Sequence, residues 1–372
     1  MKILFWSCAS LILLTYLGYP VYLYVRARFW PLPVKRASLL PNVSIVVAVH
    51  NEEKYLPTKL EGLAAIDYPP ERLQVIVVSD GSTDDTNAIL KLWQGAPSRT
   101  AVFADHRGKA AAVNRGLAVA QGEIVLFTDA RQTLALDALK QLSANFADPQ
   151  VGCVSGELMI GRDQVTACSE GAGLYWRLEK KMRLWEALTG SMVGATGAIY
   201  AVRKELLVFL PEGTILDDMY IPLHVARQGR RVVCDFQARA FDPLAPSPGQ
   251  EFRRKPRTLF GNYQLLQLAP WLLTCPNPVR FRFLGHKLSR LLMPFALLSM
   301  LFSSAALHYG IYNFALILQL IFYALALCSF VRPTSGLFSR LSNVSAAFVV
   351  LNAAAATAFF YFLTGRKAEW SH

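Results

Sequence analysis

The chain has 372 residues, of which 53% are hydrophobic, and its formal net charge is +12. A mean hydropathy of +0.30 is too high for an ordinary soluble enzyme, so the composition favours a protein with membrane-spanning segments. The positive charge is typical either of nucleic-acid binding or of contact with anionic lipids and substrates. Because no basic stripe interleaved with aromatic residues is apparent, we expect membrane lipids as partners and no nucleic acid.

Four apolar segments at the two ends of the chain are candidates to cross a bilayer. They are Ile3–Val25, Leu291–Leu307, Ile311–Val331 and Val344–Leu363. Lys and Arg cluster after the first segment and before the second, which predicts a cytoplasmic location for the middle of the chain. We therefore expect an anchor in residues 1–30, three transmembrane helices in residues 291–364 and a short tail in residues 365–372. Counting the spans puts the tail outside, whereas Arg366 and Lys367 favour the inside.

Residues 40–250 alternate short runs rich in Val, Ile and Leu with amphipathic stretches. This rhythm predicts an α/β domain with a mostly parallel sheet and helices on both faces. In chain order we expect strand Val43–Val49, helix Tyr55–Ala65, strand Gln74–Ser79, helix Thr83–Trp93, strand Thr100–Phe103, helix Ala110–Ala120, strand Glu123–Thr128, strands Val151–Ser155 and Ala198–Val202, and helix Met219–Gln228.

Residues 251–290 follow a Pro-rich stretch, Asp242–Gln250, which we expect to be a loop. They mix basic side chains with aromatic and aliphatic ones. Such a mixture is typical of amphipathic helices that lie in the membrane interface. We expect these helices to tie the soluble domain to the spans.

Aspartates mark three places where predicted strands or helices begin or end. Asp80 and Asp129 each end an apolar strand, and Asp217 and Asp218 precede the helix Met219–Gln228. Open α/β sheets bind their ligands at the carboxyl ends of their strands. The pattern therefore predicts a nucleotide and metal site with a general base. The alternative for each aspartate is helix capping.

The residues around Asp80 are candidates to bind a nucleoside. The carboxylate of Asp80 is suited to accept a hydrogen bond from a nucleobase N–H or a ribose hydroxyl. Ala48, His50 and Glu52 lie at the end of the first strand, where they either frame a nucleobase or cap a polar loop.

Asp129 and the aspartate pair are candidates for the chemical step. A carboxylate at position 129 is suited to hold a divalent cation that bridges a nucleotide diphosphate. One of Asp217 and Asp218 is suited to act as general base, with its pKa raised by its neighbour or by burial.

Two basic stretches are candidates to bind phosphate. Lys109 follows a glycine at the start of a predicted helix, where backbone N–H groups and the helix dipole attract a diphosphate. Arg254 and Arg257 lie in the run FRRKPR, which suits either a lipid phosphate or a leaving diphosphate.

Taken in order, the motifs AVHNEE, SDGSTDD, GKAAAVNRG, FTDA, TGAIYAVRKE and ILDDMYIPL resemble those of membrane-integrated family 2 glycosyltransferases, over nearly the whole chain. The family includes the cellulose, chitin and hyaluronan synthases. The resemblance implies a GT-A fold and an inverting mechanism, in which an aspartate deprotonates an acceptor hydroxyl that attacks the anomeric carbon of a UDP-sugar. It also implies Mg²⁺ or Mn²⁺ beside the leaving diphosphate.

Carried over residue by residue, the resemblance assigns roles at the nucleotide. Asp80 is similar to the family's uridine-contacting aspartate, with Ala48 and His50 beside the base. Lys109 resembles the basic group near the nucleotide.

The resemblance also assigns roles in catalysis. Asp129 matches the first aspartate of the D-x-D metal motif and is thereby implied to be the metal ligand. Asp218 matches the base of the Thr-Glu-Asp motif, and Asp217 takes the place of the glutamate.

The chain departs from the family pattern at two motifs. Asp129-Ala130-Arg131 ends in arginine, so either Asp129 holds the cation with phosphate oxygens and water, or Arg131 partly replaces the metal charge. The Gln-x-x-Arg-Trp motif of processive members reads Arg254-Lys-Pro-Arg257-Thr258 here. The retained Arg257 is suited to clamp phosphate, whereas loss of the tryptophan argues against processive synthesis.

These features predict an inverting glycosyltransferase that moves a sugar from a cytoplasmic UDP-sugar to a lipid-linked or growing glycan acceptor. Exopolysaccharide or cell-surface glycan synthesis in a bacterial inner membrane is the expected setting, with polysaccharide-assembly proteins as further partners. The alternatives are a processive polysaccharide synthase and a catalytically silent membrane protein that binds nucleotide sugar.

Overall fold

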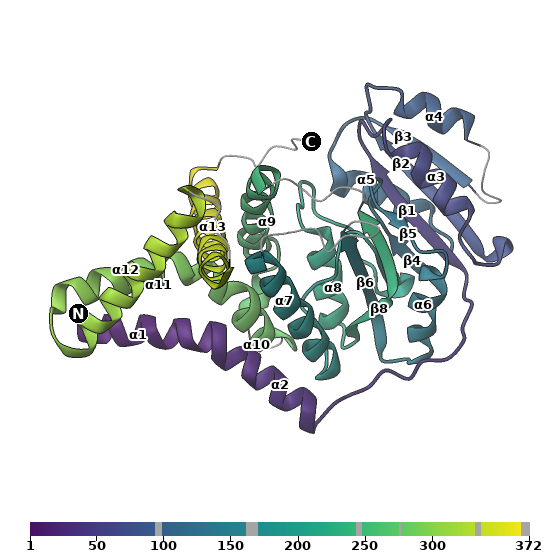
Figure 1. The fold of residues 1–372 in the computed structure, drawn as a ribbon. Helices are drawn as coiled ribbons and strands as arrows, with labels where there is room; N and C mark the ends of the chain where they lie inside the picture. Colours follow the sequence, from purple (N-terminus) through teal and green to yellow (C-terminus); the bar gives the residue numbers. More distant parts are fainter. Residues whose placement is uncertain (94–98, 161–169, 243–247, 275–276, 332–335, 366–372) are drawn as a thin grey trace.

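A computed structural model describes residues 1–93, 99–160, 170–242, 248–274, 277–331 and 336–365 (Figure 1). A sheet domain occupies one side of the molecule and long apolar helices occupy the other. The helices α7 (Glu170–Leu188) and α9 (Pro248–Leu268) lie between them (Figure 1).

Within the described residues, eight strands form one mixed sheet in the order β3-β2-β1-β4-β7-β6-β8-β5. Their bounds are β1 Val43–Val49, β2 Leu73–Asp80, β3 Arg99–Ala104, β4 Ile124–Phe127, β5 Thr133–Leu134, β6 Val151–Ile160, β7 Tyr200–Arg203 and β8 Arg231–Asp242. Strands β1 to β4 pair in parallel, as do β6 and β8, whereas β7 runs antiparallel between β4 and β6. The prediction of a mostly parallel sheet is confirmed.

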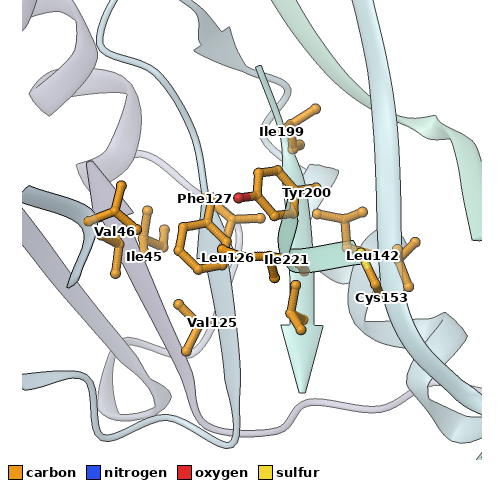
Figure 2. Close-up of a cluster of buried hydrophobic side chains, with 14 of the residues drawn as sticks. Ile45, Val46, Val125, Leu126, Phe127, Leu142, Cys153, Ile199, Tyr200 and Ile221 are labelled. Atoms are coloured by element: carbon orange, nitrogen blue, oxygen red, sulfur yellow. The ribbon is translucent and has the colours of Figure 1, made fainter. Parts of the chain in front are cut away.

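Helices pack on the sheet because its central strands are apolar on both faces. Those of the sheet domain are α3 Leu56–Ala64, α4 Thr86–Leu92, α5 Lys109–Val119, α6 Ala138–Ala144 and α8 Asp217–Arg227. One part of the hydrophobic core lies where β1, β4 and β7 meet (Figure 2). There the rings of Phe127 and Tyr200 stack with their centroids 4.7 Å apart.

The predicted strands correspond to β1, β2, β3, β4, β6 and β7, whereas α7, β5 and β8 were not predicted. Along β8, buried and exposed residues alternate irregularly, so a short-period pattern does not reveal it. The predicted loop Asp242–Gln250 is wrong at both ends, because Asp242 belongs to β8 and α9 begins at Pro248. Proline is accepted in the first turn of a helix, where its missing N–H has no partner to lose. Residues 243–247 lie outside the described residues.

Four helical segments of the described residues are long and apolar enough to cross a membrane, as predicted. They are Lys2–Phe29, Arg280–Leu307, Gly310–Ser329 and Phe338–Thr364. Their elements are α1 Lys2–Leu13, η1 Leu14–Gly18, α2 Tyr19–Phe29, α10 Arg280–Arg282, η6 Phe283–Leu288, α11 Ser289–Leu307, α12 Gly310–Val331 and α13 Gly336–Thr364. Helix α1 packs on α11, and α13 packs on α7, α9, α11 and α12.

Residues 251–290 contain most of α9, the short helix η5 (Pro270–Leu273), α10 and η6. Helix α9 packs along α13, so this segment joins the sheet domain to the spans. Its location in the membrane interface stays a prediction.

Gly156 in β6 supports a prediction about stability, because this strand changes register against β8 between Ser155 and Glu157. A Cβ at position 156 would overlap the carbonyl oxygen of Ala238 and lie 2.7 Å from Ile199 Cγ2. We expect Gly156→Ala to destabilise the protein by about 1–3 kcal/mol through overpacking, seen as a lower thermal unfolding midpoint in detergent.

Gly62→Ala in α3 is the matched control, because a Cβ there meets no atom within 4 Å. It should leave stability unchanged or raise it by about 0.5–1 kcal/mol. Equal effects of the two substitutions would contradict the packing described for β6 and β8.

Candidate active site

The ammonium of Lys109 joins two aspartates that are distant in the sequence. Its Nζ lies 2.9 Å from Asp129 Oδ1, just after β4, and 3.1 Å from Asp217 Oδ1, at the start of α8. Burial opposes the charged form of Lys109, but the attraction of both carboxylates outweighs it and raises the pKa of Lys109 above its ordinary value. Lys109 is therefore a fixed cation between two carboxylates.

Asp218 faces the same space as Asp129. A Cβ placed on Gly197 would lie 3.3 Å from Asp218 Oδ2 and 3.7 Å from Asp129 Oδ2, so the missing side chain leaves room between the two carboxylates. The N–H of Gly197 donates to Asp218 Oδ2 at 3.0 Å, and the N–H of Ala195 donates to the Asp218 carbonyl at 2.7 Å. The segment before β7 thus orients Asp218.

The pKa of Asp218 is raised to about 7. Burial is the main cause, and repulsion by Asp217 adds to it, whereas Lys109 and the Gly197 N–H act in the opposite direction. A carboxylate with this pKa is suited to accept a proton near neutral pH.

Asp80 holds the loop that leads into α5. Its side chain is 5% exposed, and its carboxylate accepts the N–H groups of Arg107 at 2.9 Å and Gly108 at 2.8 Å. His106 Nδ1 lies 3.0 Å from Asp80 Oδ2. Asp80 therefore positions the residues directly before Lys109, while its contact with a nucleobase stays a prediction.

Gly81 allows the close approach of this loop. It has a φ of 64°, and a Cβ there would lie 2.6 Å from the backbone nitrogen of His106. Any other residue would be strained in this conformation and would push the loop away.

Two histidines, of which the sequence analysis singled out only His50, lie beside Asp80. The rings of His50 and His106 have centroids 4.3 Å apart, and His50 Nδ1 lies 2.7 Å from the Asp80 carbonyl oxygen. His50, Asp80 and His106 each offer a possible metal-ligand atom, and these atoms lie within 4.8 Å of one another. The predicted nucleoside residues thus meet at the end of β2, with half-buried Ala48 nearby on β1.

Glu52 lies within electrostatic range of the aspartate cluster. Burial raises its pKa, and the charge of Asp129 adds to the shift. The negative charges of the site therefore extend to the loop after β1.

The remaining basic candidates, Arg257, Arg254 and Arg131, differ in how close they lie to the aspartates. Burial lowers the pKa of Arg257 while Asp217 and Asp129 oppose the shift, so this guanidinium lies within electrostatic range of the site. The side chain of Arg254 lies outside the described residues. Arg131 pairs with Asp242 at the end of β8, and Asp242 also accepts a hydrogen bond from Gln132 at 3.2 Å.

The carboxylate of Asp129 fits a hard divalent cation, because such ions prefer carboxylate oxygens. The carboxylates of Asp129 and Asp218 face the space that Gly197 leaves open, and the side chain of Asp129 is 40% exposed. Because Arg131 is paired with Asp242, its charge is partly compensated.

Lys59 is a residue of this site that the sequence analysis missed. It is 1% exposed, and its Nζ donates to Thr128 Oγ1 and to the Gln132 carbonyl, both at 2.7 Å. Thr128 Oγ1 in turn donates to the Ala198 carbonyl at 2.7 Å, one residue after Gly197. Lys59 thus fixes both ends of the segment that carries Asp129 and links it to the segment that orients Asp218.

A sequence signal for Lys59 exists in the helical period of α3. Leu56, Leu60 and Leu63 recur at the spacing of one buried helix face, and Lys59 lies on that face between them. A lysine on such a face is buried with a partner or reaches out to solvent, and only the folded chain shows which.

Comparison with known proteins identifies the type of domain and the fold. Residues 44–208 match the family model for Glycosyl transferase family 2. A mannosyltransferase from Pyrobaculum calidifontis, solved in complex with GDP-Man and Mn²⁺, superposes with a TM-score of 0.76 at 25% sequence identity. That match covers 98% of this chain and 99% of the mannosyltransferase. The predicted GT-A-type fold with four apolar helices is confirmed.

Curated relatives match over shorter stretches. A beta-monoglucosyldiacylglycerol synthase from Synechocystis is 31% identical over 192 residues, which are 50% of this chain and 40% of that protein. A poly-beta-1,6-N-acetyl-D-glucosamine synthase from Staphylococcus aureus is 23% identical over 234 residues, covering 61% and 56% of the two chains. The chain thus spans about half the length of the curated relatives it matches.

Lys59 leads to a prediction on pH. Burial lowers the pKa of Lys59 to about 7, although the charge of Asp129 acts in the opposite direction. The pKa of a lysine in an unfolded chain is about 10.4. Between these values the unfolded chain binds more protons, so this group makes the native state more stable as the pH rises. Above pH 7, the unfolding free energy of the wild type should therefore increase relative to that of Lys59→Met, by at most about 1.4 kcal/mol per pH unit.

Thermal unfolding midpoints measured across this pH window test the prediction. Lys54→Met, at an exposed lysine just before the same helix, should show no such pH dependence. A difference between wild type and Lys59→Met that stays constant with pH would show that Lys59 does not titrate as described.

Proposed function

Since the chain carries a family 2 glycosyltransferase domain at residues 44–208, we propose that it is an inverting transferase that moves a sugar from a UDP-sugar to a lipid-linked or growing glycan acceptor. The observation that carries the proposal is the meeting of Asp129, Lys109 and Asp218 around the space at Gly197. A carboxylate with a raised pKa beside groups that suit a diphosphate supports the proposal.

Asp218 is the proposed general base. The N–H of Gly197 holds its Oδ2, and we assign Oδ1 to the acceptor hydroxyl. Asp218 takes the hydroxyl proton while the acceptor oxygen forms a bond to the anomeric carbon. The bond between that carbon and the phosphate oxygen breaks, and the electron pair leaves with UDP. Attack from the side opposite the leaving group inverts the anomeric centre.

Lys109 and Arg257 are the proposed cations for the leaving diphosphate. Lys109 begins α5, where backbone N–H groups and the helix dipole also favour an anion. Arg257 approaches from α9, so nucleotide binding would connect the sheet domain with the helix that packs on the spans. Lys109 is already paired with carboxylates, and phosphate oxygens would compete with them for its ammonium.

Asp129 would hold Mg²⁺ or Mn²⁺. A bound divalent cation would neutralise charge on the diphosphate. The mannosyltransferase that superposes on this chain was solved with Mn²⁺.

The nucleoside end of the donor is assigned to Ala48, His50, Glu52 and Asp80. The superposed mannosyltransferase was solved with GDP-Man, so uridine and guanosine donors are both included in the test below.

The proposal for the acceptor rests on the membrane helices and on Thr258. The Trp of the processive motif would provide an aromatic platform, and Thr258 stands at this position. We therefore propose single additions to a membrane acceptor, with the sheet domain in the cytoplasm of a bacterial inner membrane and cell-surface glycan assembly as the setting.

The experiment that tests this function measures nucleotide release across a panel of UDP- and GDP-sugars, with and without a divalent cation. Gel filtration of the products then separates single addition from polymer synthesis. Nucleotide binding without release or transfer, whichever acceptor is added, would favour a catalytically silent sugar-nucleotide binding protein.

Asp218→Asn should abolish transfer, by at least about 10²-fold, because the variant lacks a general base. It should bind UDP with nearly unchanged affinity, measured by calorimetry, since the nucleotide is held by other residues. Asp137→Asn, at an exposed aspartate before α6, is the control and should keep full activity. Loss of UDP binding in Asp218→Asn would make Asp218 a nucleotide or structural residue instead.

Asp129→Asn should weaken Mn²⁺ binding in the presence of UDP, measured by the paramagnetic resonance signal of free Mn²⁺. Replacing a carboxylate ligand by an amide removes one negative charge from the site, and we expect a loss of at least about tenfold in affinity. Unchanged Mn²⁺ affinity would exclude Asp129 as the ligand, whatever the effect on transfer.

A further inference from the structure

A pocket of about 570 Å³ lies at the end of α2 and is lined by Tyr22, Val25, Arg26 and Trp30. Its walls are exposed apolar and aromatic side chains, with Tyr22 and Val25 each 39% exposed and Trp30 69% exposed. One guanidinium, that of Arg26, stands among them. Nothing in the proposed transfer reaction uses this pocket.

The length of the first span is consistent with a position of this pocket at the level of the lipid headgroups. The candidate span Lys2–Phe29 has 28 residues, or about 42 Å of helix, whereas a hydrocarbon core is about 30 Å thick. A bilayer that holds the first, uncharged part of this helix leaves the last turns of α2, which carry Arg26 and Arg28, at the headgroups on the side where the chain continues to the sheet domain (Figure 1).

Exposed aromatic residues at the end of α2 and the start of α10 support this level. Tyr24, Phe29 and Phe281 are 52%, 65% and 57% exposed. The rings of Tyr22 and Phe281 pack edge to face with centroids 5.0 Å apart, which joins α2 to the start of the second span. Exposed aromatic rings of this kind are typical of the boundary between lipid tails and water.

The positive charge at the pocket favours binding of an anion. Arg26 donates to Tyr22 Oη at 2.9 Å, and in the described part of the chain it forms no ion pair with a carboxylate. Arg26 also repels Arg282, although the carboxylate of Glu186 attracts Arg282 more strongly. Arg282 donates to the Thr189 carbonyl at 2.6 Å, so it cannot turn away without losing that bond.

We propose that this pocket binds the phosphate of an anionic phospholipid. Arg26 pairs with the phosphodiester, which also relieves the repulsion from Arg282. Tyr22, Val25 and Trp30 cover the glycerol and the first part of an acyl chain. The combination of one cation with three apolar walls fits a lipid better than a free phosphate, because a small hydrated ion gains nothing from the apolar surface.

Lipid titration of the full-length protein in a mild detergent tests the proposal, with bound lipid counted by native mass spectrometry. Phosphatidylglycerol should bind about five times more tightly than phosphatidylcholine, as expected for one cation near the headgroup. Arg26→Gln should remove this preference, whereas Arg26→Lys, which keeps the charge, should retain most of it.

Arg28→Gln is the matched control, because Arg28 is exposed on the same helix but lies two residues further on and so faces another direction. It should leave the preference for phosphatidylglycerol in place. Equal losses in Arg26→Gln and Arg28→Gln would overturn the site in favour of general surface attraction, as would equal affinities of the wild type for the two lipids.

Inorganic phosphate distinguishes the lipid from a free anion. It should not displace phosphatidylglycerol, and displacement would overturn the assignment to a lipid. If Arg26→Gln does not fold, judged by gel filtration and thermal unfolding, Trp30→Ala removes an exposed wall and should weaken both lipids. Unchanged lipid binding in Trp30→Ala would likewise overturn the proposal.

Discussion

The ion pairs of Lys109 with Asp129 and Asp217 are the interaction on which the candidate site depends. Without this ammonium, the carboxylates of Asp129, Asp217 and Asp218 would share a half-buried space, where like charges repel strongly. Lys109 is held in turn by its position after the loop that Asp80 fixes. The arrangement explains how a carboxylate with a raised pKa, Asp218, exists beside two others within a folded domain.

A second group of buried charges joins the spans to the sheet domain. The ring nitrogens of His286, in the second span, lie 2.8 Å from Glu179 and 2.8 Å from Glu186, both on α7. Tyr19 of the first span donates to Glu186 at 2.6 Å. Buried charges are costly unless paired, so these contacts favour one rotation of each span against α7. The candidate site is thereby held at a set distance from the membrane helices.

Much of the fold could be predicted from local sequence patterns. Short apolar runs and long uncharged stretches can be recognised in the sequence without knowing what they pack against. Strands such as Val43–Val49 and the span Gly310–Ser329 belong to this group. Strand β8 could not be predicted in this way, since its residues alternate irregularly and its order comes from pairing with β6. In the site, Asp129 and Asp218 could be recognised in the sequence as acidic residues at the ends of predicted elements. His106 and Lys59 do not belong to that pattern.

The sequence by itself determined most of the element types, the four apolar spans and the acidic residues that end strands or begin helices, because these depend on neighbours within a few positions. Only the tertiary structure decided that Lys109 lies between Asp129 and Asp217, that Arg131 turns to Asp242, and that a buried Lys59 links the two acidic segments. Each of these contacts joins residues far apart in the chain. Their geometry is set by how helices and strands pack, which no short stretch of sequence contains.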